Sequence, residues 1–136
     1  MADLATGDNI PSDAFDCVIL TQTLQYVYDV HAAVSTLHRI LKPSGVVLAT
    51  LPSITSLGDD RWESTWYWGF THLSATRLFH DAFPRGNVTV EQYGNVLSAS
   101  AFLYGLGSHE LSREELDHRD DRYPVTITVR ALKGRW

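Results

Sequence analysis

Residues 14–52, which read AFDCVILTQTLQYVYDVHAAVSTLHRILKPSGVVLATLP, decide the fold of this chain. The run FDCVIL at 15–20 is almost continuously apolar, which is typical of a strand buried on both faces of a parallel sheet. A second apolar run, VVLAT at 46–50, predicts another buried strand that is closed by Pro52. Two such strands with a helix between them predict a right-handed crossover in a parallel sheet, and so an α/β fold.

The helix between the two strands has a clear beginning and end in the sequence. Asp29 is the expected N-cap, because a carboxylate there can accept a hydrogen bond from the first turn. Spacings of three and four place one apolar stripe toward a core; its members are Val30, Ala33, Val34, Leu37, Ile40 and Leu41. Pro43 cannot continue the helix, and Gly45 permits an unusual backbone turn before the second strand.

Three segments in this order, FDCVIL, TLQYVYD and LHRILKPSGVVLATLP, resemble the second half of a Rossmann-like, class I S-adenosylmethionine (SAM) dependent methyltransferase of type 11. The helix of that family ends in RxLKPGG, and here Ser44 replaces the first glycine; because Gly45 remains, we expect the turn to survive. The resemblance implies an incomplete Rossmann-like α/β fold with strands four to seven of the family sheet. Strands six and seven would form an antiparallel pair at one edge.

Residues 53–73 hold three of the four tryptophans, Trp62, Trp66 and Trp68, with Tyr67 and Phe70 beside them. These rings can fill a satellite core or form the wall of a substrate cleft, and the two interpretations are compatible. The later chain alternates helix and strand patterns. First we expect a helix with Ser74 as N-cap and an apolar stripe of Leu78, Phe79, Ala82 and Phe83, followed by a strand at 87–93. A second helix is expected at 96–106, with Ala99, Phe102, Leu103 and Leu106 on one side, and then a short helix that begins with a capping box of Ser112 and Glu115. The last expected elements are a strand at 125–129 and a loose tail from Lys133.

The composition indicates one soluble domain over residues 1–136. Apolar residues make up 44% and charged residues 20%, and 11 basic against 16 acidic side chains give a net charge of −5. This balance argues against a nucleic-acid surface, and no apolar run reaches the roughly 20 residues of a membrane helix. We find no signal peptide and only one cysteine, so we expect a cytoplasmic protein in which Cys17 is a buried, inert thiol.

The glycine-rich turn with which the resembled family binds SAM is not found in this sequence. The single G-x-G, at Gly105 and Gly107, follows a helical pattern and is continued by Glu110, so the match is accidental. Residues 1–13 read as a polar loop. The chain therefore looks like the carboxyl half of a methyltransferase, and the strand at 15–20 would be left with an unpaired edge. We expect a homo-dimer, or pairing with a chain that supplies the missing half.

The resemblance implies SAM as cofactor and places four residues against it. Asp3 and Leu4 match the acidic-apolar pair that contacts adenine, with Asp8 as the runner-up; an ordinary solvated loop carboxylate is the alternative. Thr21 and Gln22 follow the first strand and match residues beside the methionine moiety and the reacting methyl group. Thr23 and Gln25 are weaker candidates for the same place. All of these polar groups could instead be loop hydrogen bonders.

The expected wall for a small-molecule substrate consists of Trp66, Trp68, Phe70 and His72. His72 is the best histidine for a substrate contact or a base, whereas His31 and His38 are expected on a solvated helix face. Methyl transfer from a sulfonium mainly requires alignment, so no catalytic residue can be named. The histidines and Cys17 show no metal-binding spacing, and no metal is expected.

Two functions follow from this sequence. The first is a SAM-dependent methyltransferase for a small-molecule or sugar-linked acceptor, present here without the glycine-rich loop. The second is a non-catalytic binding or assembly module that derives from such an enzyme.

Overall fold

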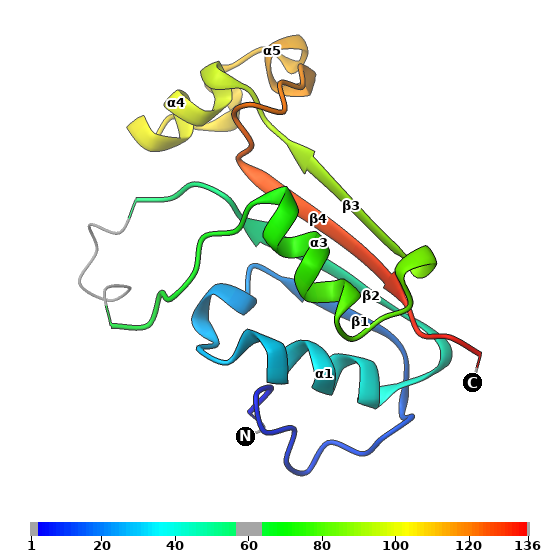
Figure 1. Ribbon diagram of the computed structural model, residues 1–136. Helices are drawn as coiled ribbons and strands as arrows, with labels where there is room; N and C mark the ends of the chain where they lie inside the picture. Colours follow the sequence, from blue (N-terminus) through cyan, green and yellow to red (C-terminus); the bar gives the residue numbers. More distant parts are fainter. Residues whose placement is uncertain (1–2, 57–63, 136) are drawn as a thin grey trace.

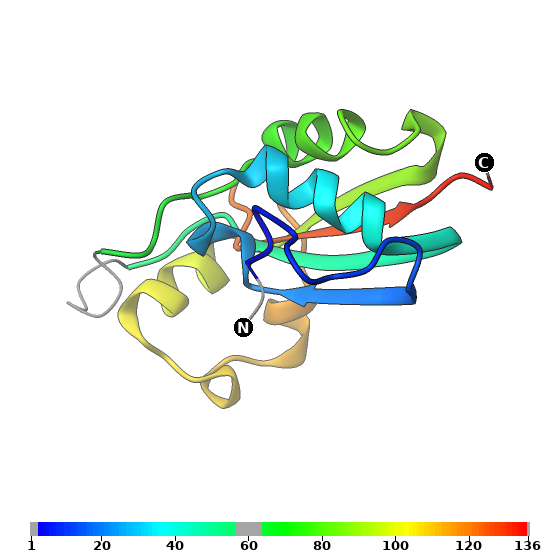
Figure 2. The ribbon, with the colours of Figure 1, turned by 90° about the horizontal axis from the view of Figure 1, so that it is seen from below.

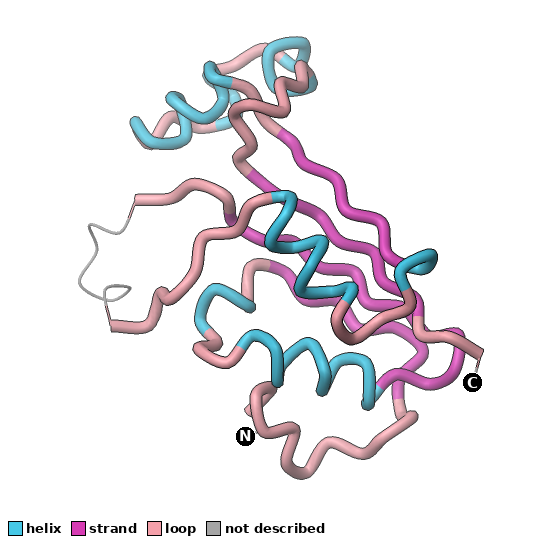
Figure 3. Tube along the Cα trace, viewed as in Figure 1, coloured by secondary structure: helices cyan, strands magenta, loops and turns pink. Residues whose placement is uncertain are grey.

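The computed structural model describes residues 3–56 and 64–135, which form a four-stranded sheet in the order β1-β2-β4-β3 (Figures 1 and 3). β1 and β2 are parallel, and β4 is antiparallel to both β2 and β3. The strands are β1 (Phe15–Thr21), β2 (Leu41–Pro52), β3 (Val88–Tyr93) and β4 (Thr126–Leu132). The expected α/β architecture is confirmed, including the antiparallel pair of β3 and β4, with β3 at an edge.

The helices are divided between the two faces of the sheet, as Figure 2 shows. α1 (Val30–Ile40) and α3 (His72–His80) cover one face, and α4 (Val96–Tyr104) and α5 (Arg113–Asp117) lie on the other side. Short turns of 3-10 helix are η1 (Leu24–Tyr26), η2 (Arg85–Asn87) and η3 (Ser108–Glu110). No helix in the described part of the chain is long and apolar enough to cross a membrane.

The hydrophobic core lies between the sheet and the α1/α3 layer. Val47, Ala49 and Leu51 alternate along β2 and are buried, because successive side chains of a strand point to opposite faces. Every member of the apolar stripe predicted for α1 is buried, and Asp29 Oδ1 accepts a hydrogen bond from the amide of Ala32 at 2.9 Å. The predicted strand, helix, strand unit and its N-cap are therefore confirmed.

The prediction for the start of α3 is wrong by three residues. Thr71 is the N-cap, and its hydroxyl accepts a hydrogen bond from the amide of Ser74. Ser74 returns the bond, since its hydroxyl accepts from the Thr71 amide at 2.9 Å. This reciprocal capping box explains why a serine at the third helical position looks like a cap in the sequence. Leu78, Phe79 and Phe83 are buried as expected.

β1 is less buried than its sequence predicts. Ile19 is 72% exposed and Phe15 is 42% exposed, whereas Leu20 faces the core. Cys17 is exposed as well, which contradicts the expected buried thiol. The exposure follows from the position of β1 at the edge of the sheet. Within residues 3–56 and 64–135, β1 pairs with β2 alone, and no helix covers the face that carries Cys17.

α4 also differs from the prediction. Ala99 and Ala101 are its buried residues, while Phe102, Leu103 and Leu106 are 49%, 50% and 47% exposed. The helix packs through its small side chains and presents its large ones outward. The α4–α5 segment lies between β3 and β4 in the chain, where an insertion was expected.

Both ends of the described chain are fixed by side chains from the core elements. Arg39 of α1 donates to the carbonyl oxygens of Gly7 and Ile10 at 2.8 and 2.9 Å, so the amino-terminal segment is held against that helix. Lys133 donates through Nζ to Asp13 and to the Leu41 carbonyl, both at 2.7 Å. The tail is thus anchored at Lys133, where looseness was expected.

Candidate functional site

The carboxyl ends of the parallel strands β1 and β2 lie side by side, with Thr21 opposite Thr50. Gln22, the residue after β1, has φ +46°, a left-handed conformation that side chains other than glycine rarely adopt. Its amide donates to the Thr50 carbonyl at 3.0 Å and lies 3.2 Å from the Thr50 hydroxyl. Strained backbone that is fixed by its neighbours is common at functional sites, and clefts of α/β sheets lie beyond this edge.

Gln25 connects this edge to the aromatic segment. Its Nε2 donates to the Gln22 carbonyl at 3.0 Å, and its own carbonyl accepts from the amides of Tyr67 and Trp68 at 2.8 and 3.3 Å. The side chain is 1% exposed, yet its Oε1 has no hydrogen-bond partner among the described atoms. A buried oxygen without a partner costs free energy, so a donor at this position would stabilise the structure.

The second predicted cofactor pair lies in the amino-terminal segment. Asp3 is exposed, and its Oδ1 accepts from the Ala5 amide at 2.8 Å. Leu4 is half-buried and packs against the core. Asp3 and Leu4 thus differ in exposure, and their role as an adenine-binding pair stays a prediction. Arg39 holds the loop that follows them, because it donates to the Gly7 carbonyl.

Of the aromatic residues predicted as one substrate wall, Trp68 and Phe70 line the same groove, whereas Trp66 is not among its lining residues. Trp66 packs edge-on against Tyr26 of η1, with 5.2 Å between ring centroids. Trp68 Nε1 donates to the carbonyls of Val27 and Tyr28 at 3.0 and 3.2 Å. Phe70 is 4% exposed, so it contributes to the core as well as to the wall of a groove. Trp62 lies outside the described residues.

His72 does not join the tryptophans. It is the first residue of α3, and its Nε2 lies 3.2 Å from the carbonyl oxygen of Val90 in β3. It borders a separate, polar depression of about 350 Å³ together with Arg119 and Asp121. His31 and His38 were both expected on a solvated helix face. His31 is exposed, as predicted, but His38 is half-buried and packs edge-on against Phe83, with 5.0 Å between the ring centroids.

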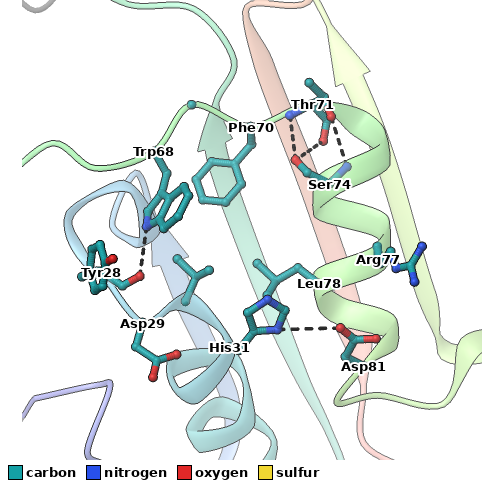
Figure 4. Close-up of a pocket in the computed structure, with 12 residues that line it drawn as sticks. Tyr28, Asp29, His31, Trp68, Phe70, Thr71, Ser74, Arg77, Leu78 and Asp81 are labelled. Atoms are coloured by element: carbon teal, nitrogen blue, oxygen red, sulfur yellow. Dashed lines mark hydrogen bonds and ion pairs between the residues drawn. The ribbon is translucent and has the colours of Figure 1, made fainter.

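A groove of about 750 Å³ runs between the start of α1 and the length of α3 (Figure 4). Trp68 and Phe70 lie at one end, and His31 and Asp81 at the other, where His31 Nδ1 and Asp81 Oδ2 are 3.7 Å apart. Ligand sites commonly have this size and a mainly apolar lining. The sequence predicts only the Trp68 and Phe70 part of this groove, because its two walls, at residues 28–31 and 68–81, lie far apart in the chain.

Thr50 and Tyr28 were also missed in the sequence. Thr50 could have been found by the rule that parallel strands end at one edge, since it occupies the same position in β2 as Thr21 in β1. Tyr28 reads as an ordinary loop residue, and only the fold places its ring 6.2 Å from that of Trp68.

The largest pKa shift belongs to an ion pair in the loop that also supplies Arg119 and Asp121 to the polar depression beside His72. Arg122 donates to Asp120 through its side chain at 2.8 and 2.9 Å and through its backbone amide, and these bonds lower the pKa of Asp120 to about 2. Both residues lie in the loop before β4. We interpret this pair as a structural feature of the loop.

Known structures with the same fold come from several kinds of protein. The cyclase SpnF is 16% identical and covers 98% of this chain with a TM-score of 0.59. A phosphoethanolamine N-methyltransferase 2 of Haemonchus contortus, in complex with phosphomonomethylethanolamine and S-adenosylhomocysteine, is 16% identical over 96% of the chain, with a TM-score of 0.58. A SAM-dependent methyltransferase of Archaeoglobus fulgidus is 15% identical over 97%, with a TM-score of 0.60.

The chain spans 54%, 36% and 66% of the lengths of these three proteins. At such identities the likeness shows the fold alone. Among curated proteins no sequence matches the chain significantly.

A sequence model of the methyltransferase domain family matches residues 3–86. The match includes β1, α1 and β2, the carboxyl edge at Thr21 and Gln22, and the predicted adenine pair. It covers more than half of the chain and agrees with the four-stranded α/β sheet. The chain belongs to the methyltransferase domain family.

Proposed function

We propose that this chain is part of a SAM-dependent methyltransferase that acts on a small-molecule acceptor, and that it contributes the carboxyl edge of the sheet to the cofactor site. The observation that carries the proposal is the left-handed Gln22 beside Thr50, in the segment that the family model matches. A strained residue fixed by two strands at this edge is a preorganised ligand contact.

Four residues of the chain would hold the cofactor. Thr21 and Gln22 offer a hydroxyl, an amide and backbone groups to the methionine end. Asp3 and Leu4 offer a carboxylate and an apolar surface to the adenine. The residues fit in chemistry, and the buried Gln25 Oε1, which has no partner among the described residues, supports a ligand contact at this edge. When bound, SAM supplies a methyl group on a sulfonium that is already activated for transfer.

The chain's own contribution to the reaction is positional. Gln25 links the loop after β1 to Tyr67 and Trp68, so the aromatic segment is fixed relative to the cofactor edge. Alignment of two reactants within one site can lower a barrier by roughly 7–11 kcal/mol in favourable cases. The acceptor is proposed as a small molecule, with a sugar-linked compound as one possibility within that class.

NMR titration tests the cofactor part of the proposal, because it detects millimolar binding residue by residue. On addition of S-adenosylhomocysteine, we expect the amide resonances of residues 21–25 and 3–4 to shift. Gln22→Ala should reduce the shifts, and His109→Ala, an exposed change in η3 outside residues 3–4 and 21–25, should leave them intact. Shifts confined to other surfaces would contradict the proposal.

A binding or assembly module is the second candidate, and the exposure of Ile19 and Phe15 on β1 favours it. An apolar edge strand is a surface that another chain can cover. In that case S-adenosylhomocysteine would leave residues 21–25 unshifted, and partner binding would depend on β1.

A further inference from the structure

We propose that the groove between α1 and α3 binds a small organic cation with an aromatic or branched apolar body, at a site separate from the carboxyl edge. The groove is lined by residues of the two helices and of the 68–71 segment, and Thr21 and Gln22 are not among them. The proposal does not rest on methyl transfer, because it concerns binding to the helix layer.

The apolar end of the groove is preorganised. The Trp68 indole is fixed by its Nε1 bonds to the carbonyls of Val27 and Tyr28, and its side chain remains 37% exposed. The Tyr28 ring, 72% exposed, lies 6.2 Å from the Trp68 ring at an angle of 31°. A binding partner therefore meets aromatic faces that need little ordering, which lowers the entropic cost of binding.

The opposite end of the groove favours positive charge. Asp81 follows α3 as its C-cap, where the helix dipole is negative, and its carboxylate points toward His31 across the groove. Asp29 adds a second carboxylate at the rim. Arg77 also borders the groove, but its guanidinium points away from the cavity in Figure 4.

These two ends together select a cation. The ammonium group is attracted to the Asp81 carboxylate at one end, and the apolar body of the ligand packs on the Trp68 and Tyr28 rings at the other. The floor between the ends is formed by Val30 and Leu78, which are 8% and 5% exposed and offer an apolar contact to the body of the ligand. Anions would meet Asp81 and Asp29 without a compensating charge inside the groove.

Benzyltrimethylammonium is a suitable probe, because its quaternary nitrogen has no lone pair and cannot accept a methyl group. Benzyl alcohol and benzoate serve as the neutral and anionic counterparts. We expect the cation to bind at least about threefold more tightly than the alcohol, because only the cation can pair with the partly exposed Asp81 carboxylate, and benzoate to bind weakest. In NMR titrations the indole N–H of Trp68 and the amides of Tyr28 and Ser74 should shift.

Two variants separate the charge from the aromatic surface. Asp81→Asn should weaken binding of the cation at least threefold and leave benzyl alcohol unchanged, since the side chain is 56% exposed and keeps its shape. Trp68→Leu should weaken both ligands. Asp117→Asn, an exposed aspartate on α5, is the matched control and should change neither.

Equal binding of the three probes, or an unchanged cation affinity in Asp81→Asn, would overturn the proposal. So would shifts that map outside the groove. A failure of S-adenosylhomocysteine to bind at residues 21–25 would leave this site unaffected, so the two proposals can fail independently.

Discussion

Ser44 lies within β2, in the bend between Leu41 and Val46 where the pairing with β1 shifts its register. Its φ is +64°, in the left-handed region where a side chain is strained. Gly45, by contrast, does not have a positive φ; a Cβ there would lie 2.9 Å from the Lys42 carbonyl and 3.1 Å from that of Phe15. The two positions of the turn therefore need different properties. Position 44 requires a residue that can adopt a left-handed backbone, whereas position 45 requires a residue without a Cβ atom.

Ser44→Gly should stabilise the protein by up to about 1 kcal/mol. The glycine removes the strain of the left-handed position, and the extra entropy it gives the unfolded chain offsets part of that gain. Urea unfolding measures the difference. Gly45→Ala in the same turn should be destabilising because of the carbonyl contacts, and a destabilised Ser44→Gly would show that strain at Ser44 is negligible.

His38 makes stability depend on pH in a defined direction. Burial lowers its pKa below the usual 6.5, with a further contribution from Lys133, and its ring packs against Phe83. The unfolded state then binds the proton more tightly than the folded state. The contribution of neutral His38 is present above the unfolded pKa and is lost as the pH falls below it toward the folded pKa.

Acidification from about pH 7 to about pH 5 should therefore destabilise the native protein more than a His38→Gln variant. Urea unfolding at several pH values, with both proteins in the same buffers, provides the comparison. His109→Gln serves as the control at an exposed position and should follow the native curve. Parallel curves for the native protein and His38→Gln would contradict the expected coupling.

At the scale of single elements, α1 shows how much of a helix is determined locally. Its N-cap, its buried stripe and its end are all visible in the sequence and all present in the fold. The same helix also acts at longer range, because Arg39 holds the amino-terminal segment through Gly7 and Ile10. Its first turn, with Val30 and His31, forms one wall of the groove.

Asp29→Ala should lower the free energy of unfolding by about 0.5–2 kcal/mol, the usual effect of removing an N-cap. The cause is the loss of the bond from the Ala32 amide to Oδ1, which leaves a donor of the first turn without its partner. Thermal or urea unfolding of both forms measures it. Asp8→Ala, at an exposed turn outside the helices, is the control; an unchanged midpoint for Asp29→Ala would mean that the cap contributes nothing.

At the scale of the whole molecule, the described residues form a four-stranded sheet in the order β1-β2-β4-β3. β1 forms one edge of it within the described residues, and the face carrying Ile19 and Leu48 is not covered by α1 or α3. The carboxyl edge of the sheet carries Thr21 and Gln22.

The G-x-G at Gly105 and Gly107 lies at the end of α4, and Gly105 is the left-handed C-cap of that helix. That glycine pair therefore ends a helix and is no phosphate-binding turn.

We expect this chain by itself to bind SAM weakly or below detection in a calorimetric titration. The cofactor contacts that we propose come from the carboxyl edge and residues 3–4, whereas a glycine-rich turn that cradles the cofactor does not occur in residues 1–136. The demethylated product should behave alike. Micromolar affinity of the isolated polypeptide would contradict this expectation and would mean that the four-stranded unit carries a complete site.

We also propose that the chain associates as a homo-dimer through β1, because an apolar edge strand is covered most simply by a second copy about a two-fold axis. Sedimentation equilibrium over a range of concentrations should detect the dimer. Ile19→Lys should shift the equilibrium toward monomer, and Leu73→Lys on α3, at a position of similar exposure, should not; the two side chains are 72% and 74% exposed. A monodisperse native monomer at high concentration would rule the dimer out.

The sequence by itself determined the strand, helix, strand unit of residues 15–52, the cap at Asp29 and the family resemblance that the match over residues 3–86 confirms. These features depend on residues close together in the chain, whose periodicity and backbone preferences act locally. The alternation in β3 and the capping box of Ser112 and Glu115 were predictable for the same reason.

Only the tertiary structure decided what each apolar surface meets. Cys17 and Ile19 have the sequence signature of a buried strand, yet they are exposed because burial depends on a neighbouring layer that no local pattern encodes. Phe102 looks like a core residue of α4 and is half exposed for the same reason. The groove with Trp68 and Asp81, and the separation of His72 from the tryptophans, arise from contacts between distant segments, so they exist only once the chain has folded.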